Sequence, residues 1–339
     1  MFDFSSFLDL PLIWGIIIAI AVLMYVVLDG FDLGVGILFP FAPSHQCRSR
    51  MMNSIAPFWD GNETWLVLGG GGLFAAFPLA YSVIMPALYM PVIFMLLGLI
   101  FRGVAFEFRF KATKAKSWIW DAAFHFGSVL AALMQGIILG NLIQGIEVTG
   151  RAFSGGPLDW ANGFSLLTGV ALVFGYALLG ATWLVLKTDG KTQDWAFDAS
   201  KYNLAFVAIF MITICIATPF IDERYFNVWF SLPNSIYLFV IPAFTVIFTG
   251  FLIYNLQKRN QVWPFLLSII LFICCYVGLG VSMYPWIVPF HFDFWQAAAF
   301  GPSQSLLLVG TVIFLPLILA YTAYCFYTFR GKSSHEAMY

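Results

Sequence analysis

Residues 10–38 read LPLIWGIIIAIAVLMYVVLDGFDLGVGIL, and this stretch decides the fold class. No charged residue interrupts it before Asp29. An apolar run of about 20 residues is long enough to cross the ~30 Å hydrocarbon core of a bilayer as an α-helix. The residues before it lack a positively charged region and a small-residue cleavage site, so we interpret the stretch as a first membrane span and not as a cleaved signal peptide.

Apolar runs of this kind recur along the chain. Of its 339 residues, 61% are hydrophobic and 10% are charged, whereas a soluble domain carries about 25% charged residues. The net charge of −1 gives no reason to expect a nucleic-acid partner. We therefore predict an all-α, polytopic membrane protein, with residues 1–339 as a single integral-membrane domain and the lipid bilayer as its solvent. About nine spans are expected, near residues 10–38, 55–77, 80–101, 118–140, 162–186, 203–220, 235–255, 263–285 and 305–328.

The basic residues divide unevenly between the two sides of the predicted bundle. When alternate connections are assigned to one side, only Arg151 and Arg224 fall on the other. The favoured side collects fourteen: Arg48, Arg50, Arg102, Arg109, Lys111, Lys114, Lys116, Lys187, Lys191, Lys201, Lys258, Arg259, Arg330 and Lys332. Cytoplasmic loops are enriched in Lys and Arg. The asymmetry predicts a multi-pass protein of the bacterial inner (cytoplasmic) membrane, with a periplasmic N-terminus and a cytoplasmic C-terminus.

The five cysteines show neither CxxC nor CxxCH spacing. This argues against a disulfide framework, a zinc site and covalently attached haem. We expect them to be small packing residues, and we expect no metal site in this chain.

Acidic residues inside the spans carry the most chemical information, because a charge at the bilayer centre costs at least ~2.5 to 3.5 kcal/mol on insertion scales. Asp29 and Asp32 are three residues apart and share a helix face, and Asp60 and Glu63 do the same. In the predicted orientation, both pairs lie in the cytoplasmic half. They form either structural ion pairs with Arg48, Arg50 or Arg102, or a protonatable chain that leads inward from the cytoplasm.

Two further features bear on chemistry and packing. Glu107 is expected at the inner end of the third span, where the spacing to Lys111 favours a helical ion pair; the alternative is a solvated charge. His125 is the one histidine well inside an expected span, too few for a chain that ligates several haems by itself. The Gly30–Gly34 step and the Gly69–Gly72 run predict close helix packing.

Four ordered blocks in the first third of the chain carry a family resemblance. They are DGFDLGVG at 29–36, NSIAPFWDGNETWL at 53–66, GGGGLFAAFPLAY at 69–81 and FRGVAFEFR at 101–109. Together they resemble subunit II of cytochrome bd-type quinol oxidases. Later segments agree more loosely: NLIQG at 141–145, MYP at 283–285 and YTAY at 321–324. The connection at 221–234 is short for this family.

The resemblance implies a subunit of a respiratory quinol:oxygen oxidoreductase that is not active alone and has no catalytic residue of its own. Its partner, subunit I, would oxidise membrane quinol and ligate two haems b and one haem d, or a third haem b. The complex would reduce dioxygen to water with cytoplasmic protons, separating charge without a pump. A bound structural quinone and small single-span subunits are further candidates.

The resemblance also implies roles for individual residues. Asp32, Trp59 and Arg102 match positions associated with haem binding or stability. Asp60 and Glu107 match positions proposed for proton uptake, and we expect Glu63 and Asp29 to act as further proton acceptors.

On the residues alone, the leading alternative is a secondary transporter with an intramembrane acidic site. Many transporters are built from paired repeats with interrupted helices, yet here the acids crowd the first three spans. A structural membrane scaffold is a third possibility. Haem absorbance of the purified complex in the red would distinguish the oxidase from both.

Overall fold

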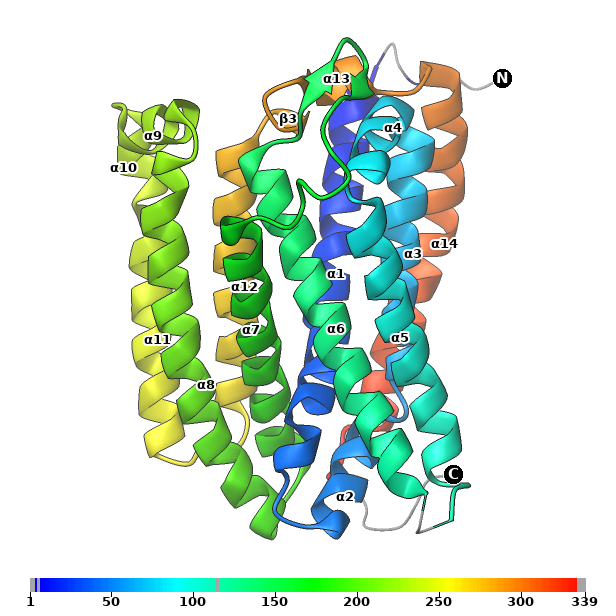
Figure 1. Cartoon of the computed structure of the whole chain (residues 1–339), viewed down its shortest axis with the longest axis vertical. Helices are drawn as coiled ribbons and strands as arrows, with labels where there is room; N and C mark the ends of the chain where they lie inside the picture. The colour runs from blue at the N-terminus through cyan, green and yellow to red at the C-terminus, as the bar shows by residue number, and fades with distance from the viewer. Residues whose placement is uncertain (1–3, 5–6, 114–115, 334–339) are drawn as a thin grey trace.

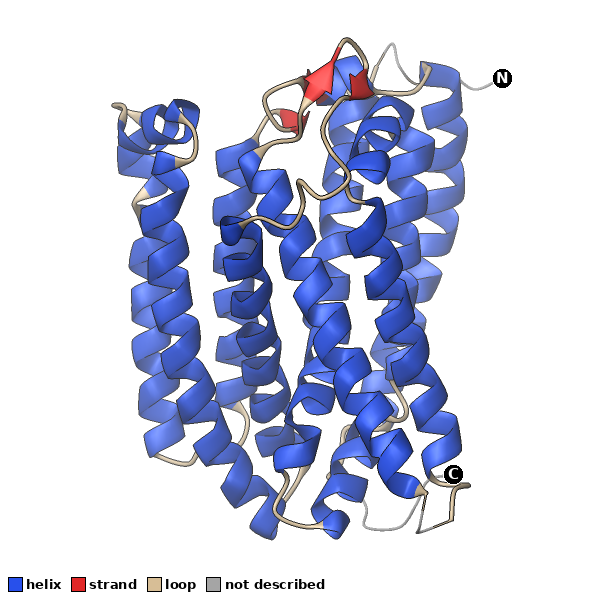
Figure 2. Ribbon diagram, viewed as in Figure 1, coloured by secondary structure: helices blue, strands red, loops and turns tan. Residues whose placement is uncertain are grey.

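The computed structural model describes residues 4, 7–113 and 116–333, and it is a bundle of long, nearly parallel helices (Figures 1 and 2). The helices, in chain order, are α1 (Leu10–Leu38), α2 (His45–Ile55), α3 (Trp59–Ala76), α4 (Pro78–Ala87), α5 (Tyr89–Arg109), α6 (Ser117–Gln144), α7 (Gly163–Lys187), α8 (Gly190–Ala217), α9 (Glu223–Phe230), α10 (Asn234–Leu238), α11 (Val240–Gln257), α12 (Trp263–Met283), α13 (Phe294–Ala297) and α14 (Gly301–Thr328). Short 3-10 turns follow α1 at Phe39–Phe41 and α8 at Thr218–Phe220.

The predicted all-helical membrane bundle is confirmed. Within the described residues, eight helices are long and apolar enough to cross a membrane. Helix α3 is 18 residues long and is not among the eight, because Asp60, Asn62 and Glu63 make its first two turns polar. With α3 as a ninth, the count agrees with the expectation from sequence.

The third span lies further along the chain than we predicted. Residues 78–101 are almost uninterruptedly apolar, so hydropathy alone places a span near 80–101. In the structure this stretch is divided at Leu88 into the short helix α4 and the long helix α5, which continues to Arg109. Arg102 therefore lies about two turns inside a helix and not at its end. Helix α8 also begins earlier than expected, at Gly190.

Glycines let the inner helices α1, α5, α6 and α7 approach closely. A Cβ atom added at Gly34 of α1 would overlap the Tyr176 carbonyl oxygen and lie 2.7 Å from the backbone nitrogen of Gly180 in α7. A Cβ atom at Gly98 of α5 would lie 2.7 Å from the carbonyl oxygen of Gly127 in α6. Close packing is the main source of helix association in lipid, so these contacts fix the relative positions of the helices.

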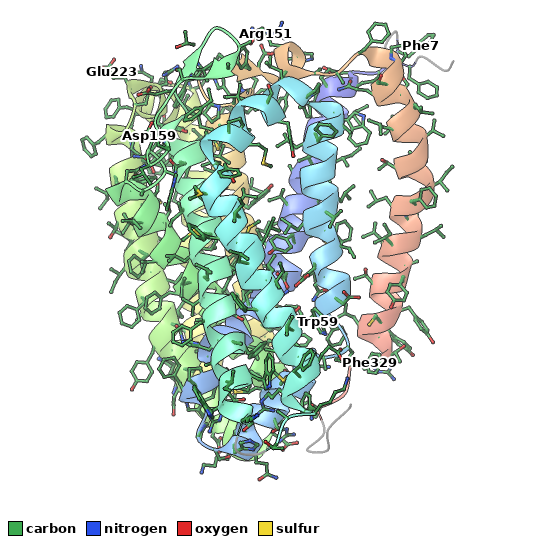
Figure 3. The ribbon with its side chains drawn as sticks, turned by 45° about the vertical axis from the view of Figure 1, so that its right-hand side comes forward. Phe7, Trp59, Arg151, Asp159, Glu223 and Phe329 are labelled. Atoms are coloured by element: carbon green, nitrogen blue, oxygen red, sulfur yellow. The ribbon has the colours of Figure 1, made fainter. Side chains whose placement is uncertain are left out.

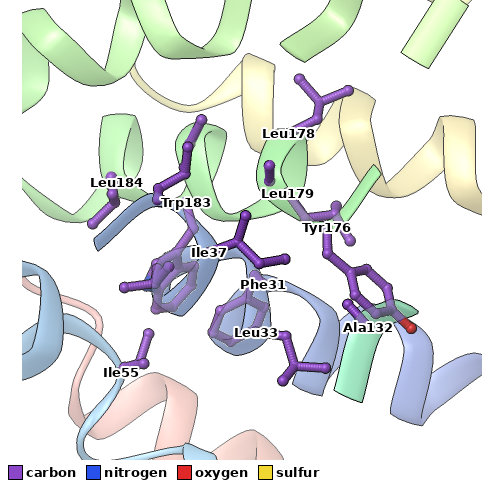
Figure 4. Close-up of a cluster of buried hydrophobic side chains, with 14 of the residues drawn as sticks. Phe31, Leu33, Ile37, Ile55, Ala132, Tyr176, Leu178, Leu179, Trp183 and Leu184 are labelled. Carbon is purple, nitrogen blue, oxygen red and sulfur yellow. The ribbon is translucent and has the colours of Figure 1, made fainter. Parts of the chain in front are cut away.

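Aromatic side chains contribute to the same core, and Phe31, Tyr176 and Trp183 lie among its aliphatic side chains in Figure 4. Phe31 of α1 stacks on Trp183 of α7, with ring centroids 4.2 Å apart. Phe58, just before α3, stacks on Phe326 of α14 at 4.5 Å. The core thus joins the two ends of the sequence.

The two ends of the bundle differ in their connections. At the upper end in Figure 1, short antiparallel pairs join β1 (Val148–Thr149) to β2 (Ala152–Phe153) and β3 (Trp286–Val288) to β4 (Phe292–Asp293). The lower end holds α2, the junction of α7 with α8 and the end of α14 (Figure 1). We call it the basic end because Arg48, Arg50, Arg109, Lys111 and Lys187 lie there. Lys114 lies outside the described residues.

Candidate functional site

Acidic side chains from α1 and α3 converge on one arginine of α5. Arg102 is fully buried, and its Nη1 atom donates a hydrogen bond to Asp29 Oδ1 at 2.6 Å. Its Nη2 atom donates to Glu63 Oε1. Asp29 is also fully buried, whereas the Glu63 side chain retains 28% exposure. The cluster therefore lies inside the bundle and reaches the surface through Glu63.

The fourth member of the cluster is held by an amide. Asp32 is fully buried, and its Oδ2 atom accepts a hydrogen bond of 2.7 Å from Asn62 Nδ2. The same amide donates to the Leu28 carbonyl oxygen at 3.2 Å. Asn62 thus ties the polar start of α3 to α1 and presents Glu63, the next residue, to Arg102.

These contacts show which of the three candidate arginines pairs with the intramembrane acids. Arg102 is the cation that pairs with the intramembrane acids, through Asp29 and Glu63 and not through Asp32. Arg48 and Arg50 instead bind Asp121 and Asp189, at 3.4 and 2.6 Å. They belong to the basic end and take no part in the cluster.

The carboxyl groups of the cluster outnumber its cations. It contains a single guanidinium and three carboxyl groups, those of Asp29, Asp32 and Glu63. Ionisation of all three would bury two uncompensated negative charges, which a low-dielectric interior strongly disfavours. The carboxyl groups of the cluster can therefore accept protons. Arg102 holds the acids of α1 and α3 close together.

A chain of neutral polar side chains continues from Asp29 into the bundle. Tyr25, one turn before Asp29 on α1, interacts with the Asp29 carboxyl group and accepts a hydrogen bond from Gln135 of α6 at 2.8 Å. Gln135 in turn accepts one from the hydroxyl of Tyr176 in α7 at 2.7 Å. Sequence reasoning missed these three residues. The four-residue step from Tyr25 to Asp29 was the one available signal.

Asp60 and Glu107 are not part of the buried cluster. Asp60 lies in the first turn of α3 and is exposed, one turn before Glu63. The Glu107 side chain is 51% exposed and pairs with Lys111 at 3.4 Å, as the spacing predicted. Trp59 is half-buried beside Asp60 and stacks on Phe106 with ring centroids 5.1 Å apart (Figure 3).

Asp60 begins an exposed stripe along α3. The stripe continues through Thr64, Val67, Gly71 and Phe74, a spacing that places these residues on one helix face. Beside it runs α14, whose best spanning window contains no buried residue. An apolar groove of about 290 Å³ lies between the two helices, lined by Leu68, Leu306, Leu307, Gly310, Thr311, Phe314, Leu315 and Ile318.

Histidine, a common axial ligand of haem iron, is scarce among the described residues. His125 is half-buried on α6, and its Nδ1 atom is 3.2 Å from the Gly36 carbonyl oxygen. The other two described histidines, His45 and His291, lie at the start of α2 and in the loop between β3 and β4. Across residues 4, 7–113 and 116–333, no group of three or more His, Cys, Asp and Glu side chains is arranged to hold a metal ion.

Comparison with known proteins gives one consistent result. A family model described as cytochrome bd terminal oxidase subunit II matches residues 10–329. Subunit 2 of the cytochrome bd-I ubiquinol oxidase of Escherichia coli (strain K12) is 29% identical over 364 residues, covering 96% of this chain and 96% of the relative. Subunit 2 of the cytochrome bd ubiquinol oxidase of Bacillus subtilis (strain 168) is 26% identical over 335 residues, covering 96% and 97%.

A solved structure shares the fold. A chain in the structure of bd oxidase from Geobacillus thermodenitrificans superposes with a TM-score of 0.76 at 16% identity, covering 95% of this chain and 99% of that one. At this identity the match bears on the helix arrangement alone.

Proposed function

Because the chain belongs to the cytochrome bd terminal oxidase subunit II family, we propose that it brings protons from the cytoplasm to a partner subunit that holds the haems. The chain is a subunit of a bd-type quinol oxidase, a multi-pass membrane protein that pairs with subunit I in a membrane complex.

We assign the haem ligands and the quinol site to subunit I. The family implies haem cofactors and quinol as the substrate, and the scarcity of suitable axial donors described above favours ligation by the partner. We propose two haems b and either one haem d or a third haem b. A structural quinone and small single-span subunits are further proposed components.

Subunit I would cover the face formed by α3 and α14. Lipid is a poor environment for Asp60, because a carboxylate facing hydrocarbon is costly. A protein partner removes this cost, and it also gives α14 neighbours that the chain itself does not provide. The groove at Gly310 lets a helix of the partner approach the α14 backbone closely.

The membrane orientation follows from the basic end. Lys and Arg are enriched in cytoplasmic loops, so we place the basic end in the bacterial cytoplasm. The start of α1, at the opposite end of the bundle, then lies on the periplasmic side of the inner membrane. This orientation puts Asp60 and Glu107 on the side from which protons would be taken up.

The proposed route begins at the surface and ends at the buried cluster. Asp60 and Glu107 take up protons at the basic end, and Glu63, one turn further along α3, passes them inward to Asp29. Each dioxygen reduced to water consumes four protons, and a dry membrane interior needs protonatable groups to deliver them. The observation that carries the proposal is the partly exposed Glu63, which joins the surface acid Asp60 to the buried Arg102 cluster.

Arg102, Asp32 and Trp59 have a different proposed role, in the stability of the haem environment. Arg102 and Asp32 are fully buried and bind groups of their own chain. They would therefore act on the haems by holding α1, α3 and α5 in place. Trp59, beside Asp60, would contribute directly to the surface that faces the partner.

Amide substitutions test the proton route, because Asp60→Asn and Glu107→Gln keep the shape and remove the exchangeable proton. Oxygen consumption with quinol should fall several-fold while haem content per complex stays near wild type. Asp198→Asn is the matched control, since Asp198 is an exposed acid of α8 paired with Lys201. Full turnover with full haem in both test variants would refute the route. Loss of haem in proportion to activity would mean that the acids are structural.

A further inference from the structure

Three neutral side chains form a buried hydrogen-bonded chain that ends at Tyr25, one turn before Asp29 on α1. Tyr25 is 3% exposed and Tyr176 is fully buried. Gln135 joins them, with hydrogen bonds of 2.8 Å to the Tyr25 hydroxyl and 2.7 Å from the Tyr176 hydroxyl. The chain crosses from α7 through α6 to α1, on the side of Asp29 away from the surface acid Asp60.

The chemistry of an amide gives this chain a direction. Tyr176 donates its hydroxyl hydrogen to Gln135 Oε1, which can only accept. Gln135 Nε2, which can only donate, donates to the Tyr25 oxygen. The Tyr25 hydrogen is then not used within the chain, and Asp29, one turn further along α1, has a buried Oδ2 atom with no hydrogen-bond partner in the described part of the protein. Both hydrogen bonds of the chain thus run in the direction of Asp29, the arrangement that favours a negative charge at its end.

Close packing keeps the chain in position. The Tyr176 ring lies against α1 at Gly30, where an added Cβ atom would be 2.8 Å from the ring Cε1. Glycine next to Asp29 therefore allows the Tyr176 ring to approach the α1 backbone. This gives Gly30, within the DGFD sequence, a function that neither helix propensity nor charge explains.

The charged and titratable groups that face Asp29 come from four helices. They are Arg102 of α5, Glu63 of α3, Asp32 and Tyr25 of α1, and Tyr176 of α7. Arg102 is the single cation among them, and it is shared with Glu63. The Tyr25 hydroxyl is therefore a donor within one helical turn of the unpartnered Asp29 Oδ2 atom, and Glu63 does not compete for it.

We propose that Tyr25, Gln135 and Tyr176 are positioning residues that stabilise the carboxylate form of Asp29 and so set the pH at which this acid takes up a proton. The inference rests on the proton route proposed above, in which Asp29 is the innermost acceptor. In this scheme the hydrogen-bonded chain sets the pH at which Asp29 takes up its proton, whereas Glu63 exchanges protons with the surface.

The test measures the pH dependence of turnover in the purified oxidase complex. Tyr25→Phe removes the donor to Asp29, so the pH limb that belongs to Asp29 should move to higher pH by about one unit, a tenfold change in the protonation equilibrium. Gln135→Leu and Tyr176→Phe should move it in the same direction by smaller amounts. Tyr276→Phe is the control, because that hydroxyl donates to the Ala19 carbonyl oxygen of α1, outside the cluster.

Two further measurements separate positioning from packing and from the route itself. The infrared band of the Asp29 carboxyl group, identified by its loss in Asp29→Asn, should titrate at higher pH in Tyr25→Phe. In an Asp29→Asn background, Tyr25→Phe should have no further effect on the pH profile. An unchanged limb and an unchanged band in Tyr25→Phe would overturn the inference. If Asp29→Asn itself leaves the pH profile unchanged, the proton route fails instead.

Discussion

Helices α7 and α14 are similarly apolar, yet they occupy opposite environments. In the 18-residue apolar stretch of each helix that would cross the membrane, 67% of the residues are buried in α7 and none in α14. The difference lies in the small and polar residues. Gly180 of α7 meets the backbone of α1, whereas Gly310 of α14 has no atom within 4 Å of an added Cβ. Hydropathy shows that both helices belong in a membrane, and close backbone contacts show which one forms the core.

The inner helices α1, α5, α6 and α7 differ from helices α8 to α11 in the same way. Helices α8 to α11 lie at the left of the bundle in Figure 1, where α8 packs on α7 and α11 packs on α12, and only 11% of the spanning stretch of α11 is buried. Lipid is as apolar as leucine, so burial of such helices against protein gains little. The inner helices instead share buried ion pairs and glycine contacts. We therefore expect substitutions in the inner bundle to be costly and substitutions in the outer helices to be tolerated.

The largest effect is expected at Arg102. Arg102→Leu removes the single cation of the cluster and leaves Asp29 buried without a compensating charge, a change that typically costs about 3 to 5 kcal/mol. Haem content and yield of the assembled complex should fall sharply, as measured by the visible spectrum per mole of complex. Lys111→Leu is the control, because Lys111 forms an exposed pair with Glu107. Equal haem content and stability in the two variants would contradict the structural importance of the cluster.

A glycine pair tests the packing difference directly. Gly34→Ala should destabilise the protein by about 1 to 3 kcal/mol, because the new methyl group overlaps the α7 backbone. Gly250→Ala in α11 meets open space and should be neutral or slightly stabilising, since alanine is the better helix former. Thermal unfolding in detergent measures both. If the two variants unfold at the same temperature, the inner helices are not held by glycine contacts.

A more local effect is expected at the segment that follows α14. Lys187, buried at the end of α7, donates to the carbonyl oxygens of Phe329 and Gly331. Lys187→Met should release this segment at a cost of about 1.5 to 3 kcal/mol, and hydrogen exchange of residues 329–333 should become faster. Lys191→Met, at an exposed position of α8, is the control. Equal protection in both variants would show that α14 is held by other contacts.

The sequence was sufficient for the spans but not for their boundaries or contacts. Apolar runs predicted the bundle, yet the continuous run at 78–101 concealed the break at Leu88 and displaced the third span. Arg102 was therefore expected at the end of a span, as one of three candidate cations for the intramembrane acids. Its burial, and its pairing with Asp29 and Glu63, depend on how α1, α3 and α5 are rotated against one another. Helical spacing alone does not determine that rotation.

The candidate site, like the fold, was predicted only in part from the sequence. The spacing of acids within the spans singled out Asp29, Asp32 and Glu63, and the family resemblance singled out Asp32 and Arg102. The structure brings these four residues together. It leaves Asp60 and Glu107 at the surface, where their role depends on a partner. Tyr25, Gln135 and Tyr176 come from three helices and share no local motif, so their juxtaposition required the fold.

In the proposed route, Glu63 carries protons between the surface and the buried cluster. Turnover per haem in the Glu63→Gln complex tests it most directly, because glutamine retains an oxygen that can accept from Arg102 and removes the exchangeable proton. We predict a normal haem spectrum with quinol oxidation reduced at least about tenfold, the lower range for loss of a positioned proton-transfer group. Wild-type turnover per haem in this variant would contradict the account.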